Sequence, residues 1–117
     1  MNRKAVFIKS QSSVFALEDL KIVKERWNGV LDKALQMKIN TIIVDGKTMV
    51  NEIKYLTYGL IGLIGDDLRK NSLSLHLVNI SPELASSLKT ALKTYYGDLA
   101  ITVNDVDAAE YTLTSYD

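Results

Sequence analysis

The sequence predicts an α/β fold in which helices pack on a mixed, mainly parallel sheet. The run Thr41–Val44, which reads TIIV, is almost entirely β-branched and apolar without polar alternation. Such a run is typical of a central strand buried on both faces. From this run onward the expected strands alternate with expected helices, which implies parallel strands joined by right-handed crossovers. The expected order is β-β-α-β-α-β-α-β-α.

The first two expected strands form a hairpin. Residues 5–8 and 14–17 are short apolar runs, and the intervening Gln11–Ser13 has turn chemistry. The hairpin would supply the one antiparallel pair of the sheet. A long amphipathic helix is expected over Asp19–Met37, because its apolar residues recur at spacings of three and four. The apolar stripe comprises Leu20, Val23, Trp27, Val30, Leu31, Ala34 and Leu35.

Two more helices are expected after the central strand. The first begins between Asn51 and Thr57 and ends near Lys70. The second begins at Ser81-Pro82-Glu83, where Ser can cap, Pro fits the first turn and Glu complements the helix dipole. It is expected to run to about Tyr96, with Gly97 ending it.

The remaining expected elements are two strands and a short final helix. The strands are Leu73–Val78 and Ala100–Val103. Asn104-Asp105 is interpreted as the cap of a final short helix that continues to about Leu113. These residues complete a single domain over 1–117, which is one domain by length.

Composition excludes several classes of function. Lys plus Arg is 14 and Asp plus Glu is 14, so the formal net charge is zero and no nucleic-acid partner is expected. The chain has no Cys, which removes thiol-based metal sites and favours a cytoplasmic location. The longest nearly uncharged apolar stretch, Tyr55–Gly65, is about 11 residues. A membrane span needs roughly 20, so none is expected.

The sequence offers little catalytic chemistry. His76 is the only imidazole, and strand alternation places it on one face with Ser74 and Val78. A packed or edge-facing histidine is the favoured interpretation. Asp66 and Asp67 are adjacent on a helix, point about 100° apart and are interpreted as a solvated face. We therefore predict no catalytic residue, no metal site and no cofactor, and an enzyme is the least favoured of three hypotheses.

Three glycines form a pattern in the second expected helix. Gly59, Gly62 and Gly65 follow one another at spacings of three, and each costs a helix roughly 1 kcal/mol relative to alanine. Close packing against a neighbour in the same chain is the favoured explanation. A shallow surface for a partner protein or an apolar ligand is the alternative.

Four features of the sequence occur together. They are the hairpin followed by Glu18-Asp19-Leu20 and a long helix, the strand 41–45 ending in Asp, the strand and turn over 73–84, and the closing strand 99–103 with Asp107-Ala108-Ala109. In these features the chain resembles a STAS domain, the family of anti-sigma factor antagonists. The family's regulatory members carry a D-S-S-G-like turn after the central strand, in which a Ser accepts phosphate. This chain has no Ser between Thr41 and Ser72.

Two registers can replace that turn. In one, Thr57-Tyr58-Gly59 stands for S-S-G, and in the other Asn51-Glu52 occupies the place. Thr57 and Thr48 are the candidate phosphoacceptors, because phosphate at a helix N-terminus is electrostatically favourable. Glu52 could instead supply a permanent negative charge.

The resemblance implies a non-enzymatic regulatory or scaffold module that binds a protein partner, either an anti-sigma factor-like kinase or a homologous subunit, with a homodimer as one form. The expected partner-binding residues are Asp45, Thr48, Asn51, Glu52, Thr57, Tyr58, Gly59 and Gly62. The alternative is a module that binds a small apolar, lipid-like ligand. Its pocket would be lined by Tyr55, Tyr58, Tyr95 and Tyr96.

Overall fold

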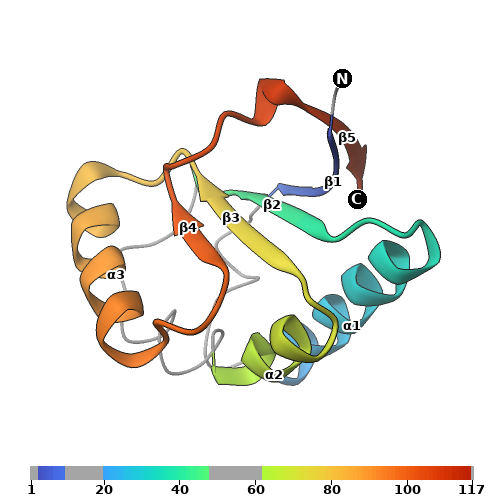
Figure 1. The fold of residues 1–117 in the computed structure, drawn as a ribbon, viewed down its shortest axis with the longest axis horizontal. Coiled ribbons are helices and arrows are strands. Elements are labelled where there is room, and N and C mark those ends of the chain that lie inside the picture. Colours follow the sequence, from blue (N-terminus) through green and yellow to red (C-terminus); the bar gives the residue numbers. More distant parts are fainter. Residues whose placement is uncertain (1–2, 10–19, 48–61, 117) are drawn as a thin grey trace.

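The structure is a computed structural model that describes residues 3–9, 20–47 and 62–116. Its elements follow the chain in Figure 1. They are β1 (Arg3–Lys9), α1 (Leu20–Gln36), β2 (Thr41–Asp45), α2 (Gly62–Lys70), β3 (Ser74–Val78), α3 (Pro82–Tyr95), β4 (Ile101–Val103), the 3₁₀ turn η4 (Ala108–Glu110) and β5 (Tyr111–Ser115).

The described strands form one five-stranded sheet in the order β4-β3-β2-β1-β5. All four neighbouring pairs are parallel, so the α/β class is confirmed. The predicted central strand is confirmed as well, because β2 lies in the middle of the order. Its Ile42 and Ile43 point to opposite faces and are both 0% exposed.

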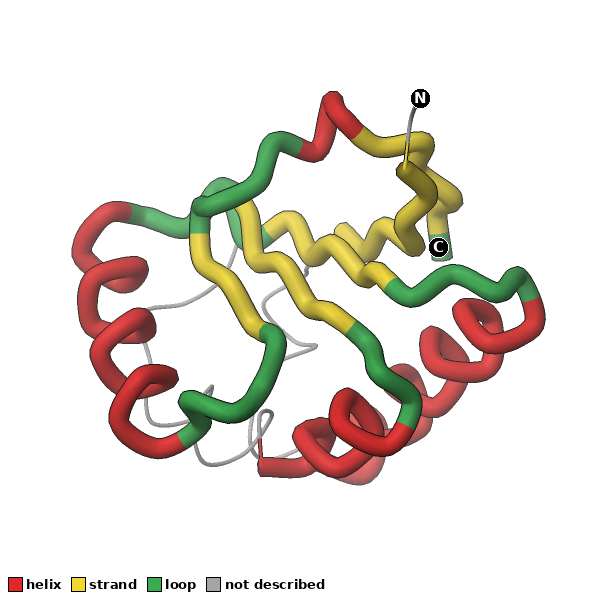
Figure 2. The backbone as a smooth tube through the Cα atoms, in the orientation of Figure 1, coloured by secondary structure: helices red, strands yellow, loops and turns green. Residues whose placement is uncertain are grey.

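The three α-helices lie on one face of the sheet, and residues 104–110 cross the other (Figures 1 and 2). We call these the helix face, the opposite face and the crossing segment. A right-handed crossover that steps one way across a sheet puts its connection on one face, and a step back puts it on the other. The chain steps from β1 to β4 in one direction and then returns past β1 to β5. One handedness therefore accounts for both layers.

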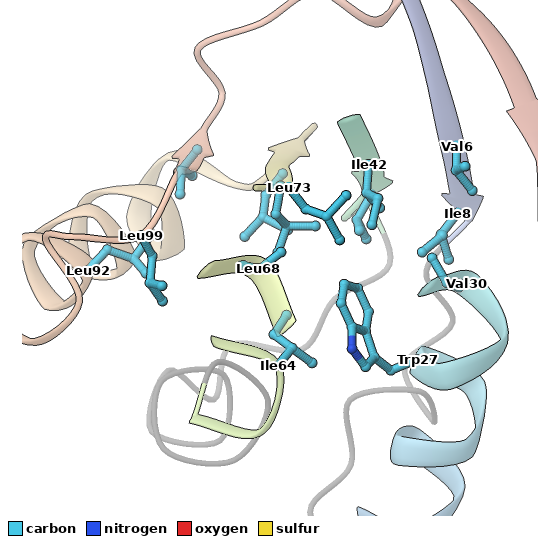
Figure 3. Packing of buried hydrophobic residues seen from close by; sticks show 14 of the residues in the cluster. Val6, Ile8, Trp27, Val30, Ile42, Ile64, Leu68, Leu73, Leu92 and Leu99 are labelled. Atoms are coloured by element: carbon cyan, nitrogen blue, oxygen red, sulfur yellow. The ribbon is translucent and has the colours of Figure 1, made fainter. Parts of the chain in front are cut away.

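The main core lies between the sheet and the helices (Figure 3). Trp27 of α1, only 6% exposed, packs into it from the α1 side. Burying side chains of this size is the main source of stability, at about 1.5–3 kcal/mol for each large apolar group. The buried members are Val6, Ile8, Trp27, Val30, Ala34, Ile39, Ile42, Val44, Ile64, Leu68, Leu73, Leu75, Leu77, Ile80, Leu84, Ala85, Leu88, Leu92, Leu99 and Val103.

A smaller core lies on the opposite face, beneath the crossing segment. Its buried residues are Ala5, Ile43 and Val78, one from each of the three central strands. Partly buried Phe7, Val106, Ala108 and Tyr111 pack against them. Seven residues reach about 25 Å only when fully extended, the 3₁₀ turn Ala108–Glu110 shortens that reach, and four inter-strand steps span about 19 Å. The crossing segment therefore has little slack and covers only a narrow band of this face.

The C-terminal residues fasten β5 to the rest of the fold. Tyr116 N donates to Phe7 O at 3.0 Å, which extends the β1–β5 pairing. The Tyr116 ring packs over Gly29 of α1, with the Arg26 guanidinium 5.6 Å from the ring centroid. Lys33 Nζ donates to Ser115 O at 2.9 Å. An edge strand with one paired neighbour is thereby tied to a helix as well.

The expected antiparallel hairpin is contradicted on its first strand. Val6 and Phe7 of β1 pair with β2 on one side and with β5 on the other, both parallel. A strand has two hydrogen-bonding edges, so no edge remains at these residues for an antiparallel partner. Residues 14–17 themselves lie outside the described residues. The described sheet is therefore all-parallel rather than mixed.

The expected final helix is also wrong. Asp107, not Asn104 or Asp105, acts as the cap: its Oδ1 accepts from Ala109 N at 2.9 Å and begins the short η4 turn. Residues Tyr111–Ser115 then form β5. The segment reads YTLTS, and its aromatic and β-branched residues favour a strand.

The other expected helices are confirmed where they are described. The helix expected over 19–37 is present as α1, and α2 ends at Lys70, while its expected start lies outside the described residues. Leu35 belongs to the predicted apolar stripe but is 47% exposed, so it is not buried in the core. α3 begins with Pro82, but the Ser81 side chain makes no capping hydrogen bond. No helix in the described residues has the length and apolarity to cross a bilayer.

Candidate functional site

The predicted contact surface is described at two of its eight residues. Asp45 ends β2 and Gly62 begins α2. The other six, including both candidate phosphoacceptors, lie outside the described residues: Thr48, Asn51, Glu52, Thr57, Tyr58 and Gly59. The expectation that they form one surface with Asp45 stays a prediction.

Asp45 links the carboxyl ends of two central strands. Its Oδ1 accepts from Lys47 N and from Asn79 Nδ2, each at 3.1 Å. Gly46 N donates to Val78 O at 2.8 Å and adds a backbone link between the same two strand ends. The carboxyl ends of parallel strands are the usual place for ligands in α/β folds. Here the half-buried Asp45 is engaged in holding that edge together.

Two asparagines shape the neighbouring turns. Asn79 and Asn104 directly follow β3 and β4 and have φ of 59° and 56°, a conformation that Asn tolerates better than most residues. Asn104 Oδ1 accepts from Ile80 N at 3.0 Å, and its Nδ2 donates to Ile80 O at 2.8 Å. A recess of about 450 Å³ lies beside them, lined by Val78, Asn79, Asn104, Val106, Asp107 and Ala108. Its two amide groups already bond within the protein, which indicates a structural role.

Two glycines of the predicted pattern, Gly62 and Gly65, are described, and both lie near the region before β4. A Cβ on Gly65 would lie 3.3 Å from Leu99 Cδ1, closer than ordinary contact, so close packing within the chain is confirmed there. A Cβ on Gly62 would lie 3.8 Å from Tyr96 Oη, which is an ordinary distance. Gly62 is exposed, and none of the described residues would obstruct a Cβ there. Gly59 lies outside the described residues.

His76 is half-buried and lies on the opposite face, in agreement with the strand alternation that the sequence predicts. Its Nδ1 is 2.7 Å from Thr102 Oγ1 on β4. The Tyr111 ring lies 6.4 Å away, tilted by 41°. Burial lowers the pKa of His76, and the negative charge of Asp105 opposes this more weakly. The imidazole therefore favours its neutral form and serves as a hydrogen-bond partner for Thr102.

His76 belongs to a row of side chains that crosses the opposite face. Phe7, Ile43, His76 and Thr102 are successive register partners on four adjacent strands. Ile43 is covered by the crossing segment, whereas the other three are half-buried. Leu113 of β5 pairs with Ala5 on the same face and is 40% exposed. The described part of this face therefore offers apolar and polar side chains beside the recess at Val106 and Ala108.

A second surface is the groove between α3 and the edge strand β4, with a volume of about 270 Å³. Its floor is apolar, with Leu92, Tyr96, Leu99, Ile101 and Val103, and its rim carries Lys89, Lys93, Gly97, Thr102 and Asp105. Tyr96 thus lines a recess, as the ligand hypothesis expects, while Tyr95 is 60% exposed. Tyr55 and Tyr58 lie outside the described residues.

Sequence reasoning missed both surfaces. Strand alternation signals the face of each residue, but Phe7, Thr102 and Leu113 share one surface only because of the strand order. No family model, curated protein or solved structure matches this chain. The geometry of these two surfaces therefore carries the functional argument.

Proposed function

We propose that this chain is a non-enzymatic protein-interaction module that binds a partner through the opposite face of its sheet. All-parallel sheets ordinarily have both faces covered, because their strands are apolar on both sides. In the described residues the helices cover one face, and the crossing segment alone spans the other. This uneven covering is the observation that carries the proposal.

The composition of the opposite face suits a protein partner. Around the covered band it presents the half-buried Phe7, His76, Thr102 and Tyr111 and the exposed Leu113. Aromatic residues beside a few polar groups are typical of interface centres. The recess at Val78, Val106 and Ala108 has its two asparagine amides already bonded within the protein, so the side chains around it are the proposed contacts.

The resemblance to STAS domains adds a regulatory or scaffold role to this proposal. A central strand that ends in Asp45 and the strand-turn-helix over 73–84 support it. The missing antiparallel partner of β1 and the strand at 111–115 count against it. Phosphorylation of Thr48 or Thr57 stays a prediction, as does the binding of an apolar ligand.

Photo-crosslinking in the source cells tests the proposal. A crosslinking amino acid at Leu113, on the opposite face, is compared with one at Lys24, which is exposed on α1. We expect one partner protein to be captured from the Leu113 position and not from the Lys24 position. The purified partner should then bind wild type and lose at least tenfold affinity for Leu113→Glu. Equal capture from both positions, or unchanged affinity, would overturn the proposal.

A further inference from the structure

The groove between α3 and β4 lies along the edge of the sheet that the described strands form. β4 ends the strand order, and all three of its residues line the groove. Leu75 N donates to Ala100 O at 2.9 Å, and Asn104 N donates to Leu77 O at 2.8 Å. In a parallel ladder this pattern turns the backbone groups of Thr102 toward β3 and those of Ile101 and Val103 outward. Val103 is buried, so the accessible stretch of the edge is at half-buried Ile101.

The groove combines this edge with an apolar floor. Leu92 and Tyr96 of α3 face Leu99 and Ile101 across it. Its volume of about 270 Å³ is below the 300–1,000 Å³ typical of small-ligand pockets. It is therefore better suited to a side chain of a partner protein than to a whole cofactor or metabolite.

The rim of the groove carries net positive charge. Lys89 Nζ lies 3.3 Å from Asp105 Oδ1, an exposed pair with side chains 50% and 55% accessible. Lys93, one helical turn further along α3, is exposed and pairs with no acidic side chain of the described residues. Among the described residues, one cation is thus left to meet an acidic group of a partner in the groove.

We propose that this groove binds a short, extended, acidic segment of a partner protein, which adds to β4 at Ile101. The backbone of the segment bonds to the outward N–H and C=O of Ile101, as in recognition by strand addition. An apolar side chain of the segment fills the groove floor, and an acidic neighbour pairs with Lys93. This site shares Thr102 with the opposite face but is built on the α3 side of β4, so its test does not depend on the function proposed above.

The test uses a capped hexapeptide of alternating Glu and Val, titrated into ¹⁵N-labelled protein. We expect saturable amide shifts along β4 and the facing side of α3, and slower hydrogen exchange at the Ile101 amide. The slower exchange distinguishes strand addition from side-chain binding alone. Lys93→Glu should weaken binding roughly fivefold, the size of an exposed charge pair. The matched control Lys24→Glu makes the same charge change on α1 and should leave binding unchanged.

Several results would overturn the proposal. These are no shifts with the peptide at millimolar concentration, shifts confined to the opposite face, or equal binding of a Lys-Val peptide. If the Ile101 amide exchanged its hydrogen equally fast in the peptide-saturated protein, strand addition would be contradicted. If octanoate gave the β4 shifts and the peptide did not, the groove would belong to an apolar ligand instead.

Discussion

Trp27 joins α1 to α2 through a hydrogen bond that the sequence does not reveal. Its Nε1 donates to Asp67 Oδ2 at 2.8 Å, while the indole itself is buried in the helix-face core. Both acids of the Asp66-Asp67 pair are interpreted from the sequence as solvated. Asp66 is exposed, as expected, but Asp67 is half-buried and bonded. The pairing spans 40 positions, so local periodicity carries no signal of it.

Asp67→Ala should therefore destabilise the protein by about 1–3 kcal/mol, the cost of leaving a buried donor unpaired. Asp66→Ala is the matched control: it removes the neighbouring acid, whose bond to Arg69 is exposed, and should change stability little. Urea unfolding followed by tryptophan fluorescence measures both, since Trp27 is the only tryptophan. Equal effects of the two substitutions would contradict the role given to the hydrogen bond.

Gly29 is required by Tyr116 rather than by the helix. A Cβ at this position would overlap the Tyr116 hydroxyl. In a helix interior, Gly→Ala ordinarily stabilises by about 1 kcal/mol. We expect Gly29→Ala to stabilise a Tyr116→Ala variant by that amount and to give no gain in wild type. Thermal unfolding of the four proteins in this double-mutant cycle measures the difference, and additive effects would argue against the contact.

At the scale of elements, the sequence predicts best where local signals and tertiary structure agree. β2 has a β-branched run at the centre of the sheet, and α3 has Pro82 at its start and Gly97 just after its end. The sequence does not predict the strand Tyr111–Ser115, because the capping signal before it also fits a longer helix, although η4 spans only Ala108–Glu110. The hairpin failed for a non-local reason: β5, from the other end of the chain, takes the second edge of β1.

An ion pair connects α2 to the turn before β4. Arg69 Nε donates to Asp98 Oδ2 at 2.6 Å, and Arg69 Nη2 donates to Asp98 Oδ1 at 3.3 Å. The hydrogen bond from Arg69 is the largest cause that lowers the pKa of Asp98 below its ordinary 3.8. A carboxyl whose pKa is lower in the folded state stabilises the fold above its unfolded pKa. That stabilisation is lost as the pH falls through the folded value.

We therefore expect Asp98→Asn to lower the unfolding midpoint at pH 7, by a small amount because both side chains are largely exposed. The difference from wild type should shrink as the pH falls below 3.8, where the unfolded chain begins to take up the proton, and should vanish below the lower pKa of folded Asp98. Thermal unfolding of both proteins between pH 7 and pH 2.5 measures this, with high salt as a second way to weaken the pair. A difference that stays constant with pH would argue against the charge.

For the whole molecule, strand order decides which surfaces exist. The sequence directs attention to the loop after Asp45, because that is where the STAS resemblance places its functional turn. The opposite face and the β4 groove depend on long-range arrangement instead. Ile101 is at an edge only because no strand follows β4 on that side in the described sheet, and Leu113 is on the surface only because β5 pairs with β1. Both facts depend on pairings between distant parts of the chain.

Engineered disulfides test this strand order directly, because the chain has no cysteine of its own. Ala5 and Leu113 are register partners on neighbouring parallel strands and share the opposite face. Adjacent strands lie about 4.8 Å apart, within the Cα separation that a disulfide allows. We expect Ala5→Cys with Leu113→Cys to oxidise readily, measured by loss of free thiol. Thr112→Cys, whose side chain points to the helix face, should stay reduced with the same partner. If a final helix stood in place of β5, the cysteine pair at Ala5 and Leu113 would not oxidise in preference to the pair at Ala5 and Thr112. The opposite face would then lack its outer strand.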